Sequence, residues 1–162
     1  MKLKPSQYAI LKSVYSFYLV CKNREPYLDS AELRRNVWEH MKENAMTKHI
    51  FIDTINGYLE HCHCLFSFGI DQTISKIMQL LKGESSYWIN KSKLSKHKFE
   101  WQDEYFGASV SPSMLEKVRV YIRNQEEHHK TNSFQQEFDE FIEKCGFQKF
   151  KDSSVKGQRG LG

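Results

Sequence analysis

Two histidines that could bind a metal, His61 and His63, lie two residues apart in the stretch HCHCLFSF, residues 61–68. Five of these eight residues are Cys, Leu or Phe, types that favour a buried strand. Successive side chains of a strand point to opposite faces, so the two imidazoles share one face. In that arrangement both can bind the same divalent cation.

The neighbouring cysteines, Cys62 and Cys64, raise the alternative of a zinc site with four ligands. Strand alternation argues against it, because the thiols point to the opposite face from the imidazoles. Phe66 and Phe68 share the cysteine face. We therefore expect the cysteines on the core side of the strand and the histidines on the other side.

A second pair with chemical potential is Tyr121 and Gln125, which are four residues apart in a stretch with helical character. That spacing puts them on the same helical face. A glutamine carbonyl oxygen is a suitable hard ligand for Mg²⁺ or Mn²⁺. A tyrosine one turn away could reach a phosphate held by that metal. A free phenol has a pKa of about 10 and is a poor nucleophile, but a nearby cation favours the phenolate.

The elements before the histidine stretch are a strand, a helix and a second strand. Residues 10–20 read as a strand, and Asp29 with Glu32 predicts a capped helix start. The buried stripe of this helix is Leu33, Val37, Met41 and Ala45. Residues 47–56 again resemble a strand, and the Asn56-Gly57 pair predicts a tight turn into the histidine strand.

The elements after the histidine strand are three helices and one strand. A helix capped by Asp71 or Thr73 contains Gly83, which we expect to permit a close backbone approach. Residues 91–98 read as a loop or a fraying helix, and residues 101–110 as the last strand. A long helix is predicted from about Pro112 to His129. The last helix, around residues 134–142, should stop at Gly146.

This order predicts an α+β, ferredoxin-like βαββαβ sandwich, with an antiparallel sheet and helices on one face. A third helix carrying Tyr121 and a C-terminal helix are added to it. The histidines should then lie on an open sheet face, a common platform for nucleic acids. We expect one domain, residues 1–150, and a flexible tail, residues 151–162.

The composition is that of an ordinary globular chain of 162 residues, 40% hydrophobic and 27% charged. No apolar run is long enough for a membrane span, and the N-terminus lacks the apolar segment of a signal peptide. Four cysteines without paired spacing predict free thiols in a reducing cytoplasm. The net charge is +4, and five lysines face one acid between residues 82 and 98. Such a segment suits a polyanion, but a solvated surface explains it equally well.

The arrangement of several short motifs resembles a known family. The chain contains, in order, HCH (residues 61–63), LKGESS (81–86), WQ and YF (101–102 and 105–106), and YIRNQ (121–125) followed by HH (128–129). This set resembles the single-tyrosine HUH transposases, and more narrowly the TnpA group, the IS200-like transposases. The similarity extends from about Val14 to Phe141 and includes a C-terminal helix with Glu137.

The resemblance implies specific roles for the candidate residues. His61, His63 and Gln125 would bind a divalent ion, Mg²⁺ or Mn²⁺, and Tyr121 would be the nucleophile. The enzyme would cut and rejoin hairpin-bearing ends of single-stranded transposon DNA through a 5′-phosphotyrosine link. It would act as a homodimer in the cytoplasm of a prokaryote, at the nucleoid when bound to DNA, with no membrane partner. Candidate DNA contacts are Lys22, Arg24, Lys82, Lys91 and Lys93.

Two positions depart from the family pattern. Cys62 stands where a bulky aliphatic residue is usual, and Glu60 stands where Asp is common. We expect neither to touch a metal ligand, although Cys62 could make the site sensitive to oxidation.

Three other functions compete with the transposase interpretation. The first is a non-catalytic, domesticated module on the same fold that binds hairpin DNA. The second is an HUH nuclease of the replication or relaxase type, against which the lone Tyr121 and the Asn124-Gln125 pair argue. The third, a structural or interaction protein, would have no need of these residues. A covalent adduct with hairpin DNA would separate the enzyme from the binding module.

Overall fold

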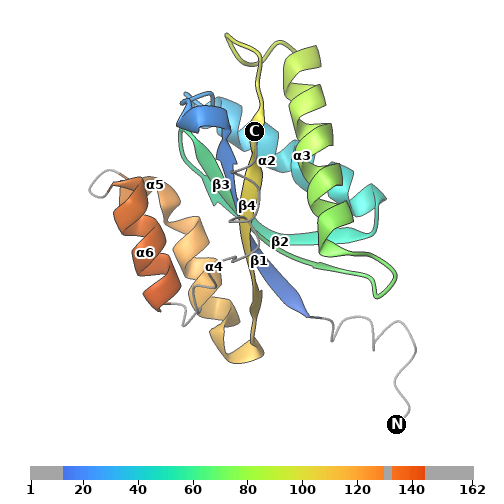
Figure 1. Ribbon diagram of the computed structural model, residues 1–162, viewed down its shortest axis with the longest axis vertical. Coiled ribbons are helices and arrows are strands. Elements are labelled where there is room, and N and C mark those ends of the chain that lie inside the picture. The colour runs from blue at the N-terminus through green and yellow to red at the C-terminus, as the bar shows by residue number, and fades with distance from the viewer. Residues whose placement is uncertain (1–12, 130–132, 145–162) are drawn as a thin grey trace, which may run out of the picture.

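The computed structural model describes residues 13–129 and 133–144. Its elements, shown in Figure 1, are β1 (Val14–Cys21), the 3₁₀ helix η2 (Lys22–Arg24), α2 (Ala31–Thr47), β2 (Ile50–Gly57), β3 (His61–Phe68), α3 (Ile74–Lys91), β4 (Trp101–Val110), the 3₁₀ helix η3 (Pro112–Met114), α4 (Leu115–Arg123), α5 (Gln125–His129) and α6 (Phe134–Lys144). The predicted helix stop at Gly146 and the predicted tail lie outside the described residues.

The four strands form one antiparallel sheet in the order β2-β3-β1-β4. With α2 and α3 on one face, this is the predicted α+β ferredoxin-like arrangement (Figure 1). The histidine strand β3 lies inside the sheet, between β2 and β1. Its backbone is therefore paired on both sides, which fixes the register of the histidines.

The core under α2 and α3 follows the predicted alternation. Cys62, Cys64 and Phe66 of β3 are buried there together with Phe17 of β1. The predicted helix stripe, Leu33, Val37, Met41 and Ala45, joins the same cluster. The cysteine face of β3 is thus the main core face, as the sequence predicted.

The opposite face of the sheet is covered, so the predicted open face is wrong. A second cluster joins Leu65 of β3 to Val118 and Ile122 of α4 and to Phe141 of α6. Figure 1 shows α4 and α6 on this side of the sheet and α3 on the other. Both added helices carry an apolar stripe, and burying those stripes against the sheet closes the face that carries the histidines.

Several predicted boundaries change in the structure. The long helix predicted from Pro112 to His129 is interrupted at Asn124, where α4 ends and α5 begins. The cap of α2 is Ser30, not Asp29: its hydroxyl accepts from the Leu33 N–H at 3.1 Å. The cap of α3 is Thr73, one of the two predicted residues.

The β2–β3 hairpin forms, but its turn is displaced. Asn56 and Gly57 are the last residues of β2, and the Tyr58 N–H donates to the His61 carbonyl at 3.1 Å. A Cβ at Gly57 would lie 2.0 Å from that carbonyl oxygen, so only glycine fits this position. At Gly83, in contrast, a Cβ would meet nothing within 4 Å, so the predicted close approach is wrong.

A membrane-spanning segment would need a long, strongly apolar helix, and none is found in the part of the chain that the structure describes.

Candidate metal and tyrosine site

The two histidines of β3 project from the sheet face that α4 and α6 cover. Both are 0% exposed, and their ring centroids are 5.5 Å apart. Tyr18 of β1, which pairs with His63, contacts both rings, with centroids 5.0 Å from His61 and 4.1 Å from His63. The imidazoles are therefore held in fixed positions by paired backbone and by an aromatic neighbour.

Gln125 meets the first histidine, as predicted. It is the first residue of α5 and is fully buried, and its Oε1 lies 2.9 Å from His61 Nε2. Its Nε2 donates to the Tyr121 carbonyl at 3.4 Å. The break at Asn124 changes the predicted continuous helix, but Tyr121 and Gln125 still both face the histidines.

Glu60 contacts a candidate ligand, contrary to expectation. Its Oε1 lies 3.0 Å from His61 Nδ1, at the turn that precedes β3. A carboxylate in this position fixes the imidazole ring and its tautomer, as such partners commonly do for metal-binding histidines.

The contacts of His61 fit a shared cation. A neutral imidazole has one N–H, and when Nδ1 uses it to donate to Glu60, Nε2 is an acceptor. That nitrogen faces Gln125 Oε1, also an acceptor, at 2.9 Å. A divalent ion bound to both atoms removes this conflict, since neighbouring ligand atoms on Mg²⁺ lie about 3 Å apart. The donors are thus suited to a divalent ion.

The Tyr121 hydroxyl lies beside the histidines within the same chain. It donates to Glu137 of α6, to Oε1 at 3.0 Å and to the main-chain carbonyl at 3.2 Å. The Tyr121 ring centroid is 5.6 Å from that of His63 and 4.7 Å from that of Phe141. Tyr121 is 7% exposed, and Glu137 and Phe141 of α6 both contact it.

Glu137 is the residue of this cluster to which the sequence assigned no role. It is 1% exposed, and one of its carboxylate oxygens and one nitrogen each of His61 and His63 all lie within 4.8 Å of one another. Its position four residues before Phe141 was the available sequence signal, because this spacing puts a carboxylate on the apolar face of a helix.

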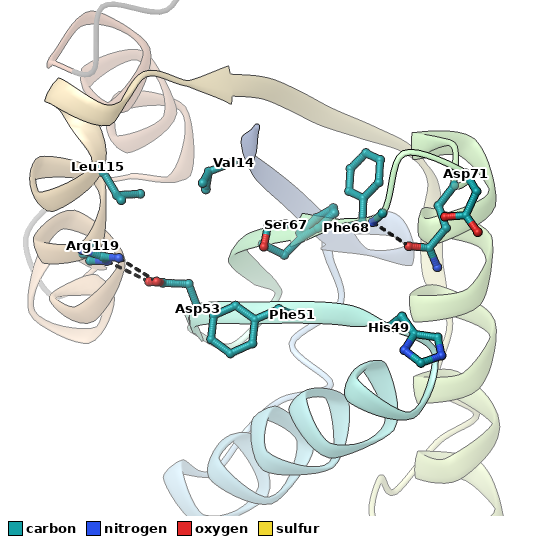
Figure 2. Close-up of a pocket in the computed structure, with 12 residues that line it drawn as sticks. Val14, His49, Phe51, Asp53, Ser67, Phe68, Asp71, Leu115 and Arg119 are labelled. Atoms are coloured by element: carbon teal, nitrogen blue, oxygen red, sulfur yellow. Dashed lines mark hydrogen bonds and ion pairs between the residues drawn. The ribbon is translucent and has the colours of Figure 1, made fainter. Parts of the chain in front are cut away.

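An ion pair fixes the tyrosine helix to the sheet. Figure 2 shows Asp53 of β2 and Arg119 of α4 pointing toward each other at one side of a pocket of about 720 Å³. Arg119 donates from Nε to Oδ1 at 2.9 Å and from Nη2 to Oδ2 at 2.8 Å. Asn56 adds a hydrogen bond to the Arg123 carbonyl at 3.0 Å. Both contacts hold α4, and with it Tyr121, against β2.

The Asp53–Arg119 pair should make part of the stability depend on pH. Arg119 lowers the pKa of Asp53. The pair therefore stabilises the fold above the unfolded-state pKa of aspartate, about 3.9, and this contribution disappears as the pH falls through the lower folded-state pKa. We expect Asp53→Asn to cost about 1 kcal/mol at pH 7 and almost nothing near pH 2, measured by urea unfolding.

Glu116→Gln is the matched control for this prediction, because Glu116 contacts the same guanidinium at 3.3 Å but is 69% exposed. It should cost under about 0.5 kcal/mol at either pH. An equal loss from Asp53→Asn at both pH values would exclude the pair as the source of the pH dependence.

The thiols do not belong to the site. Cys21, Cys62 and Cys64 are buried free cysteines, and burial raises the pKa of each thiol. Cys62 also points away from the histidines, into the main core. A buried, protonated thiol reacts slowly with oxidants, so the expected sensitivity to oxidation through Cys62 has no support here.

The candidate DNA contacts on and just after α3 lie away from the histidines, whereas Arg24 lines a pocket with Tyr18 and Phe138, next to the cluster. Lys82 and Lys91 belong to α3, on the opposite sheet face from the histidines, and Lys93 follows that helix. Lys82 donates to the Asp103 carbonyl at 2.8 Å, and Lys22 pairs with Glu100 at 3.2 Å. The Lys91 ammonium lies 5.5 Å from the centre of the Tyr87 ring. Arg24 and Lys93 are exposed, with positive φ angles of 55° and 51°. A DNA-binding role for these residues stays a prediction.

Comparison with protein families gives a match over most of the chain. Residues 9–125 match the family described as "Transposase IS200 like". The match ends at Gln125 and so includes both histidines and Tyr121. No protein of curated function matches the chain in sequence.

Two solved structures share the fold. One, from Deinococcus radiodurans R1 and described as a transposase, has a TM-score of 0.57 at 18% identity, covering 77% of this chain and 98% of the other. The second is a REP-associated tyrosine transposase bound to a REP hairpin, with a TM-score of 0.56 at 15% identity, covering 74% of this chain and 70% of the other. At these identities the likeness establishes the shared fold.

Proposed function

Because the chain belongs to the IS200-like transposase family, we propose that it cuts and rejoins single-stranded transposon ends, with Tyr121 as the nucleophile. One observation carries the proposal: the Tyr121 hydroxyl lies in the same buried cluster as His63, and Gln125 contacts His61 there. A phenol beside a set of metal donors is the combination that metal-assisted attack on a phosphodiester requires.

The metal-binding part of the proposal assigns His61, His63 and Gln125 to a divalent ion. When bound, such an ion polarises a phosphoryl oxygen and stabilises charge in the transition state, which is worth several kcal/mol. Glu60 holds the ring of His61, and Tyr18 packs against both imidazoles. These residues keep the donors in place, so that little reorganisation is needed when the ion binds.

The reaction that we propose consists of two transesterifications. The Tyr121 oxygen attacks the scissile phosphorus, a phosphorus–oxygen bond of the DNA breaks, and the proton lost by the phenol is matched by the one gained by the 3′ oxygen. The product is a 5′-phosphotyrosine link and a free 3′-OH. A 3′-OH then attacks this link and releases the phenol. One phosphodiester bond is exchanged for another in each step, so no nucleotide is consumed.

The position of α6 sets a requirement for this reaction. The histidines are fully buried, and the Tyr121 hydroxyl is held by Glu137. A phosphate of the DNA cannot contact the phenol in this arrangement. We therefore expect α6 to move away from the sheet when DNA binds.

The proposed substrate is a DNA hairpin. A structural relative is bound to a REP hairpin, and the shared fold supports a similar substrate for this chain. The proposal includes a homodimer and DNA contacts by the basic residues Lys22, Arg24, Lys82, Lys91 and Lys93. Since Tyr121 and His63 already lie together in one chain, the site can assemble without exchange of helices between protomers.

A covalent adduct with DNA would be the direct test. We expect the full chain, mixed with single-stranded hairpin DNA and Mg²⁺ or Mn²⁺, to give a protein–DNA band that survives denaturation. EDTA should remove this band, because the donors then lack their ion. Hairpin binding without such a band, across several hairpin sequences, would favour the non-catalytic binding module instead.

A further inference from the structure

We propose that Glu137 is a fourth donor to the divalent ion in the DNA-free protein. This inference rests on the proposed function, since it concerns the same ion. It goes beyond the family comparison, because the matched residues end at Gln125 and Glu137 lies outside them. Its geometric basis is that one carboxylate oxygen and one nitrogen from each of His61 and His63 lie within 4.8 Å of one another.

The burial of Glu137 supports a cation beside it. The residue is 1% exposed, and an ionised carboxylate at such a depth is costly unless an opposite charge lies close to it. The Tyr121 hydroxyl donates to Oε1 at 3.0 Å. A divalent ion held by the histidines would add a favourable positive charge beside this carboxylate and would accept one of its oxygens as a ligand.

The packing of α6 explains how a carboxylate reaches this position. Phe141, four residues after Glu137, is fully buried, with its ring centroid 5.0 Å from that of His63 and 4.7 Å from that of Tyr121. Residues four apart on a helix lie on one face. The contact that seats Phe141 on the histidine side of the sheet therefore directs Glu137 into the cluster.

The added carboxylate should raise the affinity of the site for divalent ions, while the two imidazoles determine which ion is preferred. His61, His63 and Gln125 are neutral donors, whereas Glu137 brings a negative charge and a hard oxygen. Two imidazoles with one carboxylate suit ions such as Mn²⁺, while Mg²⁺ prefers oxygen ligands and retains several waters. The DNA-free protein should thus bind Mn²⁺ more tightly than Mg²⁺.

A competing explanation is that Glu137 only positions the Tyr121 hydroxyl. The two explanations predict different metal affinities for Glu137→Gln. This variant keeps an oxygen acceptor for the phenol but removes the negative charge. Glu140→Gln is the matched control, since Glu140 lies on the same helix and its exposed carboxylate pairs with Lys144 at 3.5 Å.

The test is Mn²⁺ binding to the metal-free full chain, measured by calorimetry without DNA. We expect Glu137→Gln to weaken binding by about 100-fold or more, beyond the roughly 10–100-fold lost with a residue that only supports a ligand, and Glu140→Gln to change it less than twofold. The rise in melting temperature caused by Mn²⁺, taken against each variant's own metal-free form, should show the same order. If Glu137→Gln does not fold, Glu137→Asp, which keeps the charge at a shorter reach, should still bind Mn²⁺ more weakly than Glu140→Gln.

The outcomes separate this inference from the proposed function. Equal Mn²⁺ affinity in wild type and in Glu137→Gln overturns the role of Glu137 and leaves the histidine site intact. A wild-type protein that binds no Mn²⁺, or a His63→Ala variant that binds it as tightly as wild type, contradicts the metal centre itself.

Discussion

Replacing Tyr121 with phenylalanine is expected to abolish the covalent protein–DNA adduct while hairpin binding persists. The substitution removes the only atom of this side chain that can attack phosphorus, so the rate of adduct formation should fall by roughly 10⁴-fold or more. The fold should survive, because the ring keeps its contacts with His63 and Phe141. Denaturing electrophoresis of labelled hairpin DNA measures the adduct, and a mobility shift measures binding.

Tyr87→Phe is the matched control for this experiment. Tyr87 lies on α3 and is 62% exposed, on the far side of the sheet from the histidines. Its loss of a hydroxyl should leave both the adduct and the binding unchanged. An adduct that forms in Tyr121→Phe at the wild-type rate would mean that another residue is the nucleophile.

Removing one imidazole is the second change with a large expected effect. His63→Ala should lower metal-dependent cleavage at least about 100-fold, more than the loss of a residue that only supports a ligand. Gln125→Ala should lower it less, because one neutral oxygen donor can be replaced by water. In both variants hairpin binding should change far less than cleavage, since neither residue is among the predicted DNA contacts.

His40→Ala serves as the control for the histidine substitution. His40 pairs with Glu84 at 2.8 Å and stacks on Trp88, within the α2–α3 layer. The His40→Ala substitution should lower cleavage only to the extent that it lowers the stability of the fold. Parallel loss of binding and cleavage in Gln125→Ala would argue that Gln125 has a structural role and is not a ligand.

The local features of the site could be predicted because they depend on short periods in the sequence. Alternation along β3 separated His61 and His63 from Cys62 and Cys64, and the main core confirms that separation. The spacing of Tyr121 and Gln125 put both on the histidine side even though the helix breaks between them. A periodicity of this kind describes the faces of one strand or one helix. That was sufficient to predict on which side of the sheet these residues lie.

The predictions that were wrong concern how separate helices and strands pack against one another. The sheet face was expected to be open because nothing in the sequence states where the apolar stripes of α4 and α6 will bury themselves. The buried position of Glu137 beside the histidines follows from that same docking and was missed with it. Glu60 was not expected to touch a ligand, but the turn before β3 brings its carboxylate back to His61.

The alternation of β3 has a consequence for how this chain tolerates insertions. The strand is paired on both sides, Gly57 opposite Cys62 and Tyr18 opposite His63, and each of its faces lines a different cluster. A single residue inserted in the hairpin and taken up as a one-residue slip of β3 against β1 and β2 would exchange the faces. Thiolate sulfur, which suits soft ions, would then replace imidazole nitrogen beside Tyr121, although every original side chain would still be present. We therefore expect the length of this hairpin to be far less variable among active copies than the identity of its residues.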